Sequence, residues 1–203
     1  MIVLGLTGPS GAGKGALAEA FAPYDVPQLD TDAIYHELLV PPSPCLDALV
    51  ERFGEGILAQ DGTLNRPVLA AIVFAPDAPK EHIASLNHIT HRFILEETQK
   101  RIEKFRTAGK PAVLVDAPLL YESGFDAACD KIIAVIAPRA IRLARIMRRD
   151  SLPREAAEAR LQAQKTDDFY TARADFVVVN DGGAEMLADE AVRILTALGV
   201  IAQ

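Results

Sequence analysis

The chain opens with the stretch Ile2-Val3-Leu4-Gly5-Leu6-Thr7-Gly8-Pro9-Ser10-Gly11-Ala12-Gly13-Lys14-Gly15, in which an apolar run leads directly into a glycine-rich one. The second half has the pattern G-x-x-x-x-G-K of a phosphate-binding P-loop, and a helix-forming run at residues 16–21 follows it. Glycines let successive backbone N–H groups converge on phosphate oxygens, and the Lys14 ammonium can reach the terminal phosphates of a nucleoside triphosphate. The sequence therefore predicts a nucleotide-binding P-loop protein. The residues expected around the phosphates are Gly8, Pro9, Ser10, Gly11, Ala12, Gly13, Lys14, Gly15 and Ala16.

One position departs from the P-loop pattern. The residue after the lysine should be Ser or Thr, whose hydroxyl binds Mg²⁺, but here it is Gly15, and Ala16 follows it. Because neither residue carries a hydroxyl, the sequence predicts that other groups hold the metal.

Composition and charge argue against several classes of protein. The 203 residues carry a net charge of −7, which gives no basic footprint for nucleic acid. Cys45 and Cys129 do not form a C-x-x-C pattern, so a thiolate zinc site is not expected. No apolar run reaches the length of a membrane span, and the N-terminus lacks the layout of a signal peptide. We therefore expect a cytoplasmic protein.

Five short apolar runs, each bounded by residues that break regular structure, alternate with helical patterns. Runs rich in Val, Ile and Leu are typical of parallel strands that are buried on both faces, so the sequence predicts an α/β fold with a parallel sheet. Right-handed crossovers then place the functional loops at the carboxyl ends of the strands. The five expected strands are residues 2–7, 26–29, 112–115, 131–136 and 176–179.

Two stretches are longer than a simple crossover. Residues 33–108 look helical throughout and predict a helical insertion, and residues 138–173 predict an arginine-rich helical lid. We expect a single P-loop kinase domain over residues 1–203. Its core would consist of residues 1–32, 109–137 and 174–203. Helical insertions that close over a sheet suit phosphoryl transfer, because the reaction must exclude water.

Carboxylates follow two of the expected strands. Asp30-Thr31-Asp32 comes directly after residues 26–29, and Asp116 comes directly after residues 112–115. One carboxylate of the triplet could accept the proton of an attacking hydroxyl or anchor the water shell of Mg²⁺, and Asp116 could orient Mg²⁺ or the substrate. The alternative is purely structural, with the triplet as the cap of the next helix and Asp116 as the cap of its loop.

Six arginines lie between residues 139 and 154, although the chain is acidic overall. On a helix, Arg142, Arg145 and Arg149 fall within about 60° of one another. Such a row is often only a solvated surface, but in a P-loop protein it could neutralise the charge of a transferring phosphoryl group. We favour the second interpretation.

The four histidines form no metal-binding signature. His88 and His91 are three residues apart on one expected helix, without a third ligand at a suitable spacing. The pattern of the pair favours a polar helix face, with a substrate contact as the alternative, and His36 and His82 indicate nothing beyond a helix surface.

Taken in order, these segments resemble the dephospho-CoA kinases, which are P-loop kinases of the nucleoside-monophosphate-kinase type. The resemblance covers about residues 2 to 195, and its most specific part is the D-x-P-L-L-(F/Y)-E motif together with an R-D…R-x-x-x-Q lid. The matching segments are Gly5-Leu6-Thr7-Gly8 before the P-loop, Asp30-Thr31-Asp32, residues 62–74, Leu86-Asn87-His88-Ile89-Thr90-His91, Asp116-Ala117-Pro118-Leu119-Leu120-Tyr121-Glu122, Arg145-x-x-x-Arg149-Asp150 with Arg160-x-x-x-Gln164, and Ala174-Asp175 to Asn180-Asp181-Gly182.

This resemblance implies transfer of the γ-phosphate of ATP to the 3′-hydroxyl of dephospho-CoA, giving CoA and ADP, with Mg²⁺ as the cofactor. It implies a five-stranded parallel sheet with a helical CoA domain, in which residues 33–108 bind the acceptor, and a lid. Asp32 would be the base that faces the hydroxyl, and Lys14 and Arg149 would act on the phosphates. The other implied assignments are ATP binding by Arg145 and Asn180, acceptor binding by Asp32, Asp116, Leu119 and His91, and Mg²⁺ binding by Asp32 and Asp116, directly or through water.

Three positions depart from the family pattern: Gly15, Arg142 in place of Gln, and Arg92 in place of Pro. The alternatives are another P-loop kinase of a small molecule or nucleoside monophosphate, and a non-catalytic ATP-binding module, which Gly15 motivates. We expect ATP and dephospho-CoA as partners, no nucleic acid or membrane, and a monomer or small homo-oligomer.

Overall fold

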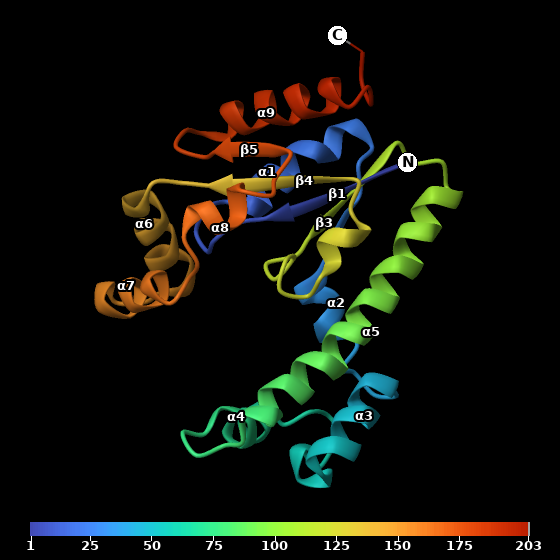
Figure 1. Cartoon of the computed structure of the whole chain (residues 1–203), viewed down its shortest axis with the longest axis vertical. Coiled ribbons are helices and arrows are strands. Elements are labelled where there is room, and N and C mark those ends of the chain that lie inside the picture. Colours follow the sequence, from blue (N-terminus) through green and yellow to red (C-terminus); the bar gives the residue numbers. More distant parts are fainter. Residues whose placement is uncertain (203) are drawn as a thin grey trace. The chain divides into compact units, whose positions relative to one another are not determined.

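The computed structural model describes residues 1–202 and contains a five-stranded parallel sheet (Figure 1). The strands follow the spatial order β2-β3-β1-β4-β5. Their bounds are Ile2–Thr7 (β1), Gln28–Asp30 (β2), Ala112–Asp116 (β3), Lys131–Ile136 (β4) and Phe176–Val179 (β5). The α/β class and the parallel sheet predicted from the sequence are confirmed.

The boundaries of two strands differ slightly from the prediction. β2 begins at Gln28 rather than at residue 26, because Pro27 has no N–H to donate to the ladder, although its carbonyl accepts the Leu114 N–H at 2.9 Å. β3 continues by one residue to Asp116, which pairs in register with Asp30 of β2 and with Leu6 of β1. The carboxyl ends of β2 and β3 therefore bring Asp30 and Asp116 to neighbouring positions of the sheet.

The chain divides into two compact units. The core unit comprises Met1–Asp30 and the chain from Ile102 onward, and the insertion unit comprises Thr31–Arg101. The helices of the core unit are α1 (Lys14–Phe21), η1 (Ala22–Tyr24), η3 (Phe125–Ala128), α6 (Arg139–Asp150), α7 (Arg154–Gln162), α8 (Asp167–Thr171) and α9 (Ala184–Ala197). The insertion unit contains α2 (Thr31–Glu37), α3 (Pro44–Phe53), η2 (Glu55–Ile57), α4 (Arg66–Phe74) and most of α5 (Lys80–Thr107).

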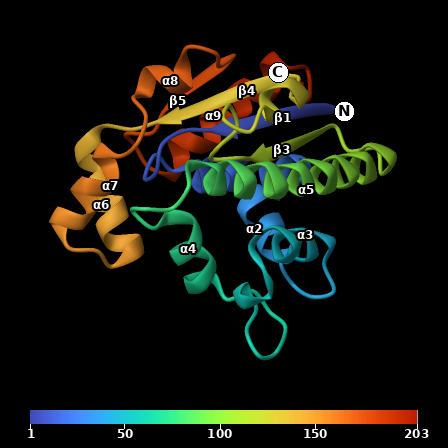
Figure 2. The same cartoon turned by 60° about the horizontal axis from the view of Figure 1, so that its bottom comes forward.

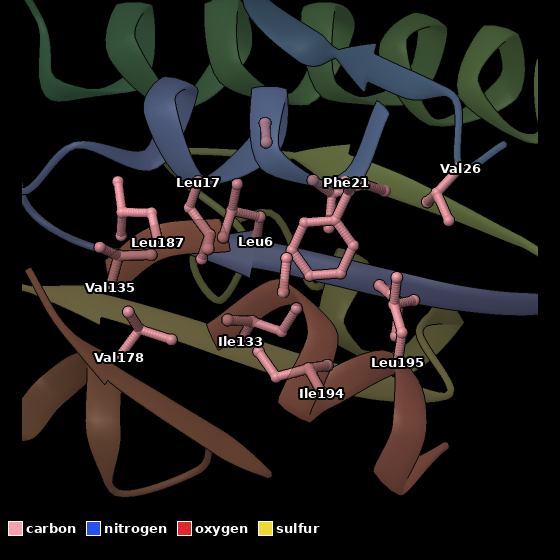
Figure 3. Packing of buried hydrophobic residues seen from close by; sticks show 14 of the residues in the cluster. Leu6, Leu17, Phe21, Val26, Ile133, Val135, Val178, Leu187, Ile194 and Leu195 are labelled. Carbon is pink, nitrogen blue, oxygen red and sulfur yellow. The ribbon is translucent and has the colours of Figure 1, made fainter. Parts of the chain in front are cut away.

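Helices α1 and α9 pack together against one face of the sheet (Figure 3). Phe21 at the end of α1 is completely buried and lies close to Leu6, Ile133 and Ile194 in the same cluster. The opposite face of the strands is also buried, as Val113 and Ala134 show. Burial on both faces explains why the strands read as continuous apolar runs in the sequence.

The insertion unit has a hydrophobic cluster of its own. Its buried members come from α2 to α4 and the segments between them, and they are Leu39, Cys45, Leu49, Ile57, Leu69 and Val73. Two of its helices have side-chain caps: the Ser43 hydroxyl accepts the Leu46 N–H at 3.1 Å, and the Asn65 side chain accepts the Val68 N–H at 3.4 Å. The sequence therefore marks the starts of α3 and α4 with suitable N-cap residues.

The helices of residues 1–202 differ from membrane-spanning segments. None of them combines the length and the apolar character that a bilayer crossing requires.

We expect Phe21→Ala to lower the free energy of unfolding by about 3–5 kcal/mol, because it leaves a cavity between α1, α9 and the sheet. Urea unfolding at equilibrium measures this loss. Val192→Ala on α9 is the matched control, because Val192 is 38% exposed and its truncation should cost less than about 0.5 kcal/mol. Equal losses for both variants would contradict the packing described here.

Candidate active site

The glycine-rich loop between β1 and α1 has the backbone conformation that its glycines predict. Gly8, Gly11 and Gly13 have φ values of 143°, 79° and 97°, in the region that favours glycine. An added Cβ would lie 2.1 Å from the Val135 carbonyl oxygen at Gly8 and 2.1 Å from the Asn180 Nδ2 at Gly13. These two glycines are therefore required both by backbone conformation and by close neighbours.

The N-terminus of α1 continues this loop. Helix α1 begins at Lys14, and no side chain caps its start, nor does an acidic residue occupy its first turn. The N–H groups of the first turn and the positive end of the helix dipole thus face the loop without a competing carboxylate on the helix. The Lys14 ammonium donates a hydrogen bond to the Gly8 carbonyl at 3.0 Å, so the lysine folds back over the loop. This arrangement is suited to an anion such as a phosphate.

Arg142 and Gln164 hold the first half of the loop through Ser10. The Ser10 N–H donates to the Gln164 Oε1 at 2.9 Å, and the Ser10 carbonyl accepts from the Arg142 Nε at 3.2 Å. The Arg142 Nη2 donates to the same Gln164 oxygen at 2.8 Å, which closes a ring of three residues (Figure 2 shows α6 beside α7). Arg142 also pairs with Asp167 of α8 at 3.3 Å.

Arg145 and Asn180 hold the second half of the loop through Ala12. The Asn180 Nδ2 donates to the Ala12 carbonyl at 2.7 Å, and the Arg145 Nη1 donates to the same carbonyl at 3.1 Å. The Arg145 Nη2 donates to the Asn180 Oδ1 at 3.1 Å, so these two side chains also bind each other. Asn180 follows β5 and is only 2% exposed. The structure thus brings Arg145 and Asn180, both predicted as ATP-binding residues, to the backbone of the loop.

The three arginines on one face of α6 have different environments. Arg142 is 7% exposed, and burial lowers the pKa of its guanidinium, although Asp167 opposes this shift. The Arg149 side chain is 56% exposed, and its Nη2 donates to the Ser10 hydroxyl at 3.2 Å. Arg149 also binds both oxygens of Asp150, at 2.7 and 2.9 Å, which raises the pKa of the guanidinium further. Of the three, Arg149 is therefore the one with an exposed guanidinium beside the loop.

The predicted acceptor and metal residues lie in both units. In the core unit, Asp116 ends β3, and Leu119 lies in the following loop with an exposure of 52%. In the insertion unit, Asp32 lies in the first turn of α2, and His91 is half-buried on α5, where burial lowers its pKa. Within residues 1–202, no three His, Cys, Asp or Glu side chains form a group that could hold a metal by themselves.

The contacts of Arg142, Gln164 and Tyr121 were not predicted. Gln164 stands in the R-x-x-x-Q motif, but nothing in the motif indicates that its side chain binds the Ser10 backbone. The Tyr121 hydroxyl donates to the Tyr170 carbonyl at 3.0 Å, and the Arg173 guanidinium lies 3.7 Å from the centre of the Tyr121 ring. These contacts join the loop after β3 to α8 and the residues that follow it. A sequence pattern cannot predict them, because the two segments are far apart along the chain.

Comparison with known proteins gives a consistent result. The sequence profile of the dephospho-CoA kinase family matches residues 2–186. A dephospho-CoA kinase from Anaeromyxobacter dehalogenans is 38% identical over 198 residues, covering 98% of this chain and 92% of the relative. The solved structure of a dephospho-CoA kinase from Campylobacter jejuni is similar with a TM-score of 0.70 and 27% identity, covering 97% of this chain and 96% of that one. A shikimate kinase from Acinetobacter baumannii has a TM-score of 0.54 at 19% identity, covering 98% of this chain and 93% of that one, so this likeness concerns the fold alone.

We expect Gly13→Ala to weaken nucleoside triphosphate binding strongly and to lower the Tm, because Gly13 has a positive φ and a Cβ there would strike Asn180. A non-glycine residue in such a backbone conformation costs about 1–3 kcal/mol before the clash is counted. Gly15→Ala is the matched control: no heavy atom lies within 4 Å of its added Cβ, and the position is helical. Thermal unfolding and titration with ATP measure both effects, and equal behaviour of the two variants would contradict this account.

Proposed function

The chain belongs to the dephospho-CoA kinase family, and from this premise we propose how its residues divide the work of the reaction. It is an ATP-dependent kinase that phosphorylates dephospho-CoA in the biosynthesis of CoA. The observation that carries this conclusion is the family match over residues 2–186, which includes the glycine-rich loop and the side chains that hold it.

ATP binds, in this proposal, with its phosphates on the loop formed by residues 8–16. The N–H groups at the start of α1 and the Lys14 ammonium supply the donors, and the bonds of Arg145 and Asn180 to Ala12 keep the loop in shape. Asn180 also lies near the adenine. A loop that is fixed before the nucleotide arrives needs little reorganisation during the reaction, which favours catalysis.

Asp32 acts as the general base. Its carboxylate accepts the proton of the 3′-hydroxyl of dephospho-CoA while that oxygen bonds to the γ-phosphorus of ATP. The bond between the γ-phosphorus and its bridging oxygen breaks, and ADP leaves with the electron pair of that bond. Asp116, Leu119 and His91 contribute to acceptor binding. The exposure of Leu119 supports this role, since an apolar side chain in a loop is then open to a ligand.

Mg²⁺ fits the donors that these residues offer. The ion usually keeps several waters and binds proteins through one or two carboxylates together with the phosphates of the substrate, so a cluster of three protein ligands is not needed. Asp32 and Asp116 would hold it, directly or through water, since Gly15 has no hydroxyl. When bound, the ion neutralises charge on the β- and γ-phosphates.

Arg149 stabilises the charge of the γ-phosphoryl group during transfer. Its guanidinium lies beside the loop at Ser10 and is oriented by Asp150, which in turn accepts from the Arg160 Nη1 at 2.7 Å. A guanidinium in a fixed position can donate two hydrogen bonds to phosphoryl oxygens. Residues 138–173 would then act as the lid that carries this arginine.

The test is ADP release by the purified protein with ATP and Mg²⁺, comparing dephospho-CoA with AMP, shikimate and no acceptor. We expect release that depends on dephospho-CoA and yields CoA. Release with AMP or shikimate alone would assign the protein a different acceptor, and ATP binding without release would favour a non-catalytic module.

Two further points stay predictions of the sequence. The first is a cytoplasmic location. The second is that the protein is a monomer or a small homo-oligomer, and light scattering on the purified protein measures its oligomeric state.

We expect Asp32→Asn to lower kcat by about 100-fold or more and to leave ATP binding nearly unchanged, because it removes the base but not the phosphate cradle. Asp30→Asn is the control, since Asn is also a good residue before the first turn of α2 and Asp30 is not the proposed base. Steady-state kinetics and ATP titration measure both. An unchanged kcat in Asp32→Asn would contradict the assignment of Asp32 as the general base.

We expect Arg149→Ala to lower kcat by about 1,000-fold, with a much smaller effect on ATP affinity, if its guanidinium acts mainly on the transition state. Arg148→Ala is the control, because Arg148 is the exposed neighbour on the same helix. Loss of ATP affinity at constant kcat would instead make Arg149 a ground-state contact.

A further inference from the structure

Three side chains gather in the insertion unit where α2 meets the start of α4. Tyr35 and His36 belong to α2, and Arg66 is the first residue of α4. The Arg66 Nη2 lies 2.6 Å from the His36 Nδ1, and the Arg66 guanidinium lies 5.7 Å from the centre of the Tyr35 ring. We call these three residues the α2–α4 cluster.

The α2–α4 cluster carries a positive charge that no carboxylate among residues 1–202 neutralises through an ion pair. Arg101 in the same unit is different, because it pairs with both Glu37 and Glu97. Glu37, the neighbour of His36, is thus occupied by Arg101. Burial raises the pKa of the Tyr35 phenol, so the ring adds no negative charge beside Arg66.

The contact between Arg66 and His36 also leaves hydrogen-bond donors available. A guanidinium can only donate, so the His36 Nδ1 must accept, and the proton of the imidazole is then on Nε2. Arg66 is exposed and uses one N–H for this contact. The cluster can therefore offer several N–H donors together with one positive charge, which suits a phosphate or diphosphate.

The α2–α4 cluster lies one helical turn from the proposed base. His36 follows Asp32 by four residues on α2, so the two side chains share a face of the helix and are separated by about 6 Å along its axis. In a nucleotide, the 3′-hydroxyl is on the ring carbon C3′, and the 5′-phosphate is attached through the exocyclic C5′ to the neighbouring ring carbon C4′. Only five covalent bonds connect the 3′-oxygen to the 5′-phosphorus, so the two groups can lie along one helical turn, whose pitch is roughly 5.4 Å.

We propose that Arg66 and His36 bind the 5′-diphosphate of the acceptor while Asp32 of the same helix faces its 3′-hydroxyl. This inference rests on the proposed function and adds a specificity determinant to it. One turn of α2 would then contact the phosphate and the preceding turn would contact the hydroxyl. Such a helix selects acceptors by the distance between their phosphate and their hydroxyl. An acceptor without the 5′-phosphate group could reach Asp32 but would not be held in register.

The first experiment measures the KM for dephospho-CoA at saturating ATP in the unaltered protein, Arg66→Ala and Arg52→Ala. We expect Arg66→Ala to raise this KM by about 10- to 100-fold, the range for lost hydrogen bonds to a charged group, with the KM for ATP unchanged. Arg52 is a matched control, because it is also exposed in the insertion unit and also stacks on an aromatic ring, that of Phe53 at 5.2 Å. An unchanged KM in Arg66→Ala, or an equal rise in Arg52→Ala, would overturn the inference.

A second measurement does not depend on how much of a variant is folded. AMP and adenosine differ only in the 5′-phosphate, and the ratio of their inhibition constants against dephospho-CoA, at saturating ATP, isolates the contribution of that group. We expect AMP to bind more tightly than adenosine in the unaltered protein and the ratio to approach one in Arg66→Ala. A ratio that is the same in both proteins would contradict the proposal. Failure of the proposed function is distinguishable, because the unaltered protein would then release no ADP with dephospho-CoA, and the inference would fall with its premise.

Discussion

The core unit depends on one constraint: the backbone of the glycine-rich loop must approach other groups more closely than any side chain allows. At Gly13 the Asn180 amide occupies the space where a Cβ would stand, and at Gly8 the Val135 carbonyl does so. The absence of side chains lets Asn180 and Arg145 bind the Ala12 carbonyl from one side. The N–H groups at the start of α1 then remain for a phosphate.

Charge is distributed so that an acidic protein can bind anionic substrates. The net charge is −7, yet four cationic side chains bind groups of the loop, namely Lys14 and the arginines Arg142, Arg145 and Arg149 of α6. Most of these arginines are held by backbone carbonyls or by carboxylates, so their positions are fixed before a ligand binds. Fixed donors favour the transition state because they need not reorganise when charge develops.

The departures from the family pattern have different structural meanings. A Cβ added at Gly15 would lie in open space, so the loop would accept a hydroxyl-bearing residue there without a clash, and the proposed Mg²⁺ site relies on carboxylates instead. Arg142 reaches Ser10 and Asp167 and shares the Gln164 oxygen with the Ser10 N–H. Arg142 therefore fixes the shape of the loop and does not offer its guanidinium to the substrate. The spacing of three arginines on one helix face could not show which of them has this role.

The sequence by itself determined the strands, the glycine turn and the family, because each depends on local patterns: continuous apolar runs, glycines at positions of positive φ, and short motifs. Through the resemblance to the family, it also indicated Arg145 and Asn180 as ATP-binding residues. It could not determine that these two meet at the Ala12 carbonyl, that Gln164 binds Ser10, or that Arg66 reaches His36 across 30 residues of chain. Such contacts join residues that are distant along the chain, and only the packing of helices against the sheet and against one another brings their side chains within hydrogen-bonding distance.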